Sequence, residues 1–128
     1  MTDAHAPGWL PRFLAPRHAL AECDIIEWHG DGVADTPGAD ARCRLRVEID
    51  TRGDAPRIRR AVFSVFGPPV AVACADWACE WLGDRTIDAA RGLMVEDFEQ
   101  ALALAPGERY AALLVIDALA SVLVNLGS

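Results

Sequence analysis

The sequence predicts an α+β fold, with a small antiparallel sheet of about three strands and helices packed mainly on one of its faces. Residues 42–49 alternate polar and apolar side chains, the pattern of a strand with one buried face. A turn and a β-branched, aromatic segment follow directly, which indicates an antiparallel partner strand. The rest of the chain has helical spacing, so the helices follow the strands and cover one face of the sheet.

The elements before and around the sheet are expected in the following order. Residues 9–20 carry apolar side chains at helical spacing, and Pro16 should stop or bend that helix. Residues 30–40 are rich in Gly, Asp and Pro and are expected to form a loop. Residues 51–56 should form the turn that leads into the return strand, residues 58–66.

The segment after the second strand predicts a central buried helix. Proline is well tolerated in a first helical turn, so Pro68 and Pro69 can open the helix. The helix should run to about Leu82 and end at Gly83 in a left-handed conformation. Because the segment is apolar almost all round, it should lie in the core.

Three further helices are expected after the central one. Thr86 can cap a short helix that ends at Ala90, and residues 95–104 form the next. Residues 110–126 form the last helix. Its side chains expected to pack inward are Leu113, Leu114, Ile116, Leu119 and Leu123.

Composition narrows the functional classes. The 128 residues suit a single domain, with residues 1–8 expected as a flexible tail. The net charge of −7 argues against nucleic-acid or anionic-membrane binding. No apolar run is expected to approach the ~20 residues that cross a bilayer. The N-terminus lacks a basic start and an apolar core, so no secretion signal and a cytoplasmic location are expected.

Six short motifs, in order, resemble those of one family. The chain is similar to the U-type iron–sulfur cluster assembly scaffolds, the IscU proteins and the N-terminal domain of NifU. The segments that carry the resemblance are RFLAPRHAL (12–20), GADARCRLRVEI (38–49), AVFSVFG (61–67), EWL (80–82), TIDA (86–89) and VIDAL (115–119). The resemblance covers residues 9–126 and implies the same α+β fold.

The resemblance also implies where a site would lie. Such scaffolds hold a nascent 2Fe–2S cluster on three cysteines, with a neighbouring Asp or His completing the site. The second family cysteine falls at Pro68, and the third falls at Ala111, with Tyr110 at the family His. The first falls at Ala41, with Cys43 at the family Asp, or a two-residue slip makes Cys43 the family cysteine itself.

These replacements predict a degenerate member of the family. We expect an accessory or adaptor, not an enzyme, which holds no stable cluster and docks to a cysteine desulfurase or an iron–sulfur client protein. One alternative is a persulfide acceptor similar to SufE, with Cys43 as its catalytic thiol. In that case Arg42, Arg44 and Arg17 would lower the thiol pKa. The other alternative is a protein-interaction module without sulfur chemistry.

The remaining cysteines offer little for a metal. Cys74 and Cys79 point about 140° apart on their helix, so they are interpreted as core residues. Weak iron or zinc binding would use Cys43. A zinc group could gather Cys23, His29 and Cys43. Its fourth ligand would be Asp31 or Asp40.

Overall fold

A computed structural model of the chain describes residues 7–20, 29–36 and 41–126. Its elements are α1 (Leu10–Leu14), β1 (Gly30–Thr36), β2 (Ala41–Asp50), β3 (Arg57–Phe66), α2 (Pro69–Leu82), α3 (Ile87–Ala90), α4 (Val95–Leu102), a 3-10 turn (Pro106–Glu108) and α5 (Arg109–Leu126). The three strands form one antiparallel sheet in the order β1-β2-β3.

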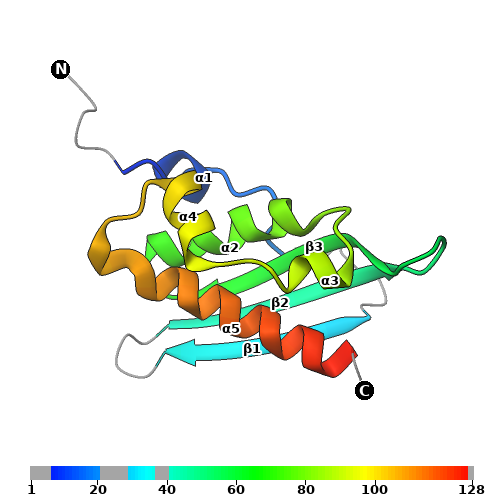
Figure 1. The fold of residues 1–128 in the computed structure, drawn as a ribbon. Helices are drawn as coiled ribbons and strands as arrows, with labels where there is room; N and C mark the ends of the chain where they lie inside the picture. The colour runs from blue at the N-terminus through cyan, green and yellow to red at the C-terminus, as the bar shows by residue number, and fades with distance from the viewer. Residues whose placement is uncertain (1–6, 21–28, 37–40, 127–128) are drawn as a thin grey trace.

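The helices pack on one face of this sheet. α5 lies across β1 and β2, and α2 packs against β3 (Figure 1). The β2 side chains that face the helices are fully buried, whereas those between them reach solvent on the other face. This alternation is the one that the sequence shows, and the α+β expectation is confirmed. The buried β2 side chains are Cys43, Leu45 and Val47.

The expectation of a loop over residues 30–40 is wrong for its first part, because Gly30–Thr36 is strand β1. The strand pairs with β2 from Gly30 opposite Val47 to Thr36 opposite Ala41. A Cβ added to Gly32 would lie 2.5 Å from the backbone nitrogen of Val122 in α5. The glycine therefore serves the close approach of a helix to a strand, not a loop. Residues 37–40 lie outside the described part.

The central helix matches the prediction except at its end. Pro68 precedes it in an extended conformation, and a run of small and apolar side chains buries most of α2. Gly83 has φ −57°, so it does not take the left-handed conformation. Asp84 takes it instead, with φ 67°. The cap on α3 is as predicted, since the Thr86 hydroxyl accepts a hydrogen bond from the Ala89 amide at 3.1 Å.

The last two helices differ from the expectation in detail. α4 ends at Leu102, two residues early, and Ala103 follows it in a left-handed conformation. Leu113 was expected to pack inward, but it is 47% exposed. It lies on the side of α5 that faces away from the sheet, whereas Leu114 and Leu119 are buried as expected.

One segment is long and apolar enough to cross a bilayer, contrary to the expectation from the sequence. The segment Pro106–Leu126 is 21 residues long, and an 18-residue window within it has a mean hydropathy of 1.6. Length and composition alone are weak grounds, because core helices of soluble proteins meet the same test. Here α5 packs against β1 and β2 in the manner of a core helix.

A buried carboxylate anchors the N-terminal segment. Asp76, on α2, is fully buried. It accepts hydrogen bonds from the Arg12 guanidinium at 2.8 Å and from the backbone amides of Arg17 and His18 at 2.7 and 2.8 Å. The chain then runs beside β3, where the Leu20 amide donates to a β3 carbonyl at 2.7 Å. The predicted flexible tail falls largely on residues outside the described part.

Candidate functional site

The positions implied by the family resemblance lie at one end of the sheet, which we call the site end. β2 begins there at Ala41, β3 ends there, and the N-termini of α2 and α5 lie beside them (Figure 1). A Cβ added to Gly67 would lie 2.9 Å from the Ala41 Cβ, so the chain just before Pro68 touches the start of β2. Tyr110 lies in the first turn of α5. The Cys74 thiol of α2 is close enough to it that a negative charge on this thiol would raise the pKa of the Tyr110 phenol.

The side chains at these positions do not fit an iron–sulfur cluster. Ala41 and Ala111 offer only buried methyl groups, and Pro68 has no donor atom. Tyr110 is half-buried, and burial raises the pKa of its phenol, which keeps it protonated at neutral pH. Iron–sulfide units need thiolate ligands, and none of these four residues supplies one.

Cys43 lies inside the core and not at an accessible surface. Its side chain is 0% exposed, and burial raises the pKa of its thiol to about 12. The expectation that neighbouring arginines lower this pKa is wrong. Arg42 and Arg44 are directed to the opposite face of the sheet, where they pair with Asp35 and Asp31 at 2.6 and 2.5 Å.

The other two described thiols do not rebuild a metal site. The pKa of the Cys74 thiol is raised to about 12, mainly by burial and further by the charges of Glu108 and Cys43. The pKa of the Cys79 thiol is raised well above its ordinary value, mainly by burial and further by the charges of Cys43 and Asp76. Cys43 is therefore close enough to influence each of the other two thiols, and all three are enclosed. Within the described ranges, no group of three or more His, Cys, Asp or Glu side chains could hold a metal ion.

The three described members of the expected zinc group, His29, Asp31 and Cys43, do not lie together. His29 accepts a hydrogen bond from the Ile49 amide at 2.8 Å, at the end of β2 opposite to Cys43. Six strand residues separate those two positions on β2, which corresponds to about 20 Å. The carboxylate of Asp31 is engaged by Arg44. Cys23 and Asp40 lie outside the described residues.

One functional group at the site end was missed from the sequence. Glu108 accepts a hydrogen bond from the Trp9 indole N–H at 3.1 Å and another from the Ala105 amide at 2.8 Å. It places a carboxylate near Cys74 and Tyr110. A Glu three residues after the start of a helical turn can accept a hydrogen bond from the first amide, and this half of a capping box is a signal that the sequence contains; Ala105 has no side-chain acceptor for the other half.

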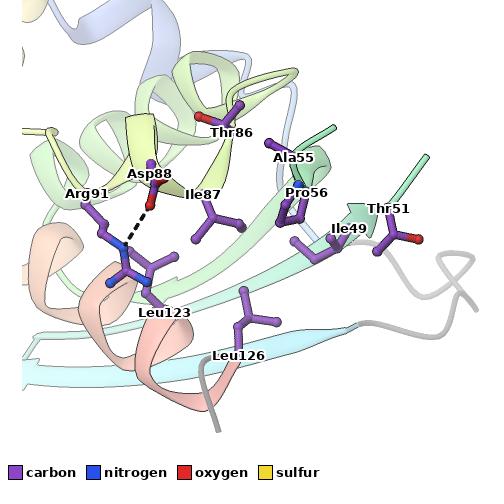
Figure 2. Close-up of a pocket in the computed structure, with 10 residues that line it drawn as sticks. All are labelled: Ile49, Thr51, Ala55, Pro56, Thr86, Ile87, Asp88, Arg91, Leu123 and Leu126. Atoms are coloured by element: carbon purple, nitrogen blue, oxygen red, sulfur yellow. Dashed lines mark ion pairs between the residues drawn. The ribbon is translucent and has the colours of Figure 1, made fainter. Parts of the chain in front are cut away.

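A separate pocket lies at the opposite end of β2. Figure 2 shows apolar side chains from the β2–β3 turn, α3 and α5 around it, with an ion pair between Asp88 and Arg91 at its rim. Its volume is about 370 Å³. The residues that line it include no cysteine or histidine, so it does not extend the site end. The apolar lining residues are Ile49, Ala55, Pro56, Ile87, Leu123 and Leu126.

Comparison with known proteins gives a consistent result. The family model described as the NifU-like N terminal domain matches residues 10–125. The chain is 29% identical over 96 residues to an iron-sulfur cluster assembly enzyme IscU from Drosophila melanogaster, covering 75% of this chain and 60% of that protein. It is 28% identical over 90 residues to an iron-sulfur cluster assembly scaffold protein IscU from Azotobacter vinelandii, covering 70% and 68%.

The fold has a solved counterpart. The crystal structure of the N-terminal part of a nitrogen-fixing NifU-like protein from Brucella abortus superposes with a TM-score of 0.66. The superposition covers 98% of this chain and 95% of that one, at 12% sequence identity. At this identity the likeness concerns the fold alone.

Proposed function

The chain belongs to the NifU-like N-terminal domain family, and on this premise we propose that it works in iron–sulfur cluster assembly as an accessory or adaptor that holds no stable cluster. One observation carries the proposal. Pro68 and Ala111 stand where the resemblance implies the second and third cysteine ligands, and the first falls at Ala41 or at the fully buried Cys43. The relatives that are named as assembly scaffolds support the process, and the matched region spans 60% of the fly protein.

The thiol chemistry of the chain supports the same proposal. A cluster is cargo for a scaffold, and its iron atoms are gripped by thiolates. The thiols of Cys43 and Cys74 have pKa values of about 12, so both are protonated at neutral pH. Each would have to leave the core and lose its proton before it could bind iron. Neither iron nor zinc is therefore expected to bind more than weakly.

The role left to the chain is docking. The partner that we propose is a cysteine desulfurase or an iron–sulfur client protein, and the contact surface is the site end. Phe66 is largely exposed there, directly before Gly67 and Pro68. An exposed aromatic side chain beside a rigid proline is suited to a protein interface. The acidic chain does not suit nucleic acid or anionic lipid, and its free thiols suit the cytoplasm.

The persulfide-acceptor alternative gains no support from the geometry. Sulfur transfer requires a thiolate that can reach a persulfide on another protein. Cys43 is enclosed, and its neighbouring arginines serve ion pairs on the other face of the sheet. Mass spectrometry after incubation with a desulfurase and cysteine would detect added sulfur on Cys43, and we expect none on the folded protein.

Anaerobic reconstitution tests the proposal directly. The protein is incubated with iron, sulfide and a reductant, desalted, and measured for visible absorbance and for iron per chain. We expect no stable chromophore, and the result should be the same with Cys23→Ser. A chromophore at near-stoichiometric iron would overturn the proposal.

A restored site supplies the matched control. The triple variant Ala41→Cys, Pro68→Cys, Ala111→Cys returns three thiols to the site end. It should gain a chromophore that the wild type lacks. The same three positions changed to serine should gain none. A desulfurase pull-down with the wild type, compared with Phe66→Ser, then tests docking separately from cluster binding.

A further inference from the structure

We propose that the solvent-facing side of α5 binds a second copy of this chain. This surface is a stripe of four residues, Leu113, Asp117, Ala120 and Val124, which we call the α5 stripe. Their spacing of four, three and four residues places them on one face of the helix. All four are exposed, and Val124 is 72% exposed.

A shallow groove runs beside the stripe. It lies between α5 and the segment that joins α3 to α4, and its volume is about 290 Å³. Apolar side chains of Leu93, Ile116 and Leu123 line it together with Ala120 and Val124. Stripe and groove share Ala120 and Val124, and apart from Asp117 and Arg91 their side chains are apolar. Exposed apolar surface of this kind marks interaction sites on folded domains.

Charge complementarity identifies the occupant. Asp117 is the one charged residue of the stripe, and within the described residues no ion pair to it is found. Arg91 lines the groove and extends from α3 toward Leu123 (Figure 2). Its ion pair with Asp88 is loose, at 3.9 Å, and the Asp88 side chain is 99% exposed. The surface therefore carries one anion and one cation available to each other across an interface.

A two-fold arrangement satisfies both charges at once. If two α5 helices cross antiparallel with Ala120 on the axis, Ile116 of each copy lies opposite Val124 of the other. Asp117 then lies opposite Leu123 of the other copy, beside Arg91. The same patch serves both copies, as a closed dimer requires. The small side chain of Ala120 permits close approach of the helices at the crossing.

The proposed interface leaves the site end free. Ten residues separate Tyr110 from Ala120, which corresponds to about 15 Å along the helix. Dimer formation and docking at the site end are therefore compatible, and this inference does not depend on the proposed function. Apolar contact supplies the affinity, and the two ion pairs fix the register of the helices.

Sedimentation velocity from micromolar to millimolar protein tests the inference. We expect the mass to rise with concentration from 13.8 kDa toward twice that value. Ala120→Glu places two carboxylates face to face on the axis and should weaken the dimer at least tenfold. Ala101→Glu, the same change on the exposed face of α4, should have no effect. Circular dichroism checks that each variant is folded.

A charge exchange makes the test specific. Asp117→Arg and Arg91→Asp should each weaken the dimer severalfold, and the double variant should restore it. A wild type that is monomeric at every concentration overturns the inference, as does a dimer that Ala120→Glu leaves intact. Failure of the double variant to restore binding overturns the proposed register. A different protein that binds the α5 stripe of a purely monomeric chain would overturn the choice of a second copy.

Discussion

Removal of the Asp76 carboxylate should detach the N-terminal segment from α2. The side chain is fully buried and accepts three hydrogen bonds, one from the Arg12 guanidinium and two from the backbone amides of Arg17 and His18. In Asp76→Ala all three donors lose their acceptor. The guanidinium can turn to solvent or to Glu80, but the two amides are part-buried and fixed by the chain.

The size of the effect follows from these contacts. Each part-buried amide left without a partner costs about 1–3 kcal/mol. The Arg12 guanidinium adds little, because it is partly exposed and can turn to solvent or to Glu80. For the two amides together we therefore expect Asp76→Ala to lower the free energy of unfolding by about 2–6 kcal/mol. Glu80→Gln is the matched control, because Glu80 contacts the same arginine at 3.3 Å but is 50% exposed, and it should cost at most about 1 kcal/mol.

Urea unfolding followed by circular dichroism measures the loss, and hydrogen exchange locates it. In Asp76→Ala the amides of Arg17 and His18 should exchange much faster than in the wild type, while amides in the middle of β2 change less. Asp76→Asn keeps one side-chain oxygen, which can still accept from both amides because they share Oδ1, and places its NH₂ group toward Arg12, so it should lose the ion pair but keep slow exchange of the Arg17 and His18 amides. If Asp76→Ala lies within about 1 kcal/mol of Glu80→Gln, the anchoring role is refuted.

Two further predictions concern β1. Gly32→Ala should destabilise the fold by about 1–3 kcal/mol in urea, because the new methyl would lie 2.5 Å from the Val122 nitrogen. Gly107→Ala meets no atom within 4 Å and is the control; equal effects would contradict the packing argument. The Asp31 pKa should lie below 3.8 by carboxyl NMR, because Arg44 donates to the carboxylate, and Arg44→Gln should raise it. The stability that the Asp31–Arg44 pair contributes is present above pH ~3.8 and is lost as the pH falls through the lower pKa of Asp31 in the folded state. An Asp31 pKa that is unchanged in Arg44→Gln would contradict this prediction.

The strand β2 was predictable because the alternation of polar and apolar residues within the strand itself indicates a sheet with one buried face. The strand β1 was not, because glycine at a close approach and glycine in a loop look alike in the sequence. What distinguishes them is Val122, about ninety residues away. The helix caps show the same limit. The cap at Thr86 was predictable because threonine is a common N-cap residue, whereas the left-handed residue after α2 is Asp84 and not the predicted Gly83.

The candidate site was predicted by the order of its motifs, and its chemistry only in part. Period-two geometry already directs Arg42 and Arg44 away from Cys43, so residues adjacent in sequence lie on opposite faces. Applied consistently, that rule would have excluded a lowered thiol pKa. Asp76 is another recoverable signal, since an acidic residue in the middle of an apolar helix needs buried donors. Which donors it finds depends on the path of residues 12–18, which no local pattern reveals.

The hydrogen bond between Trp9 and Glu108 gives the molecule a built-in optical reporter. It joins residues separated by 99 positions and holds an indole beside the turn that leads into α5. A binding partner that lifts the first helix away would move that indole from a carboxylate into water and shift its emission. The same displacement would remove a hydrogen-bond donor from the Glu108 carboxylate, a charge close to Tyr110. A displacement of the first helix would thus change the surroundings of Glu108, directly before α5.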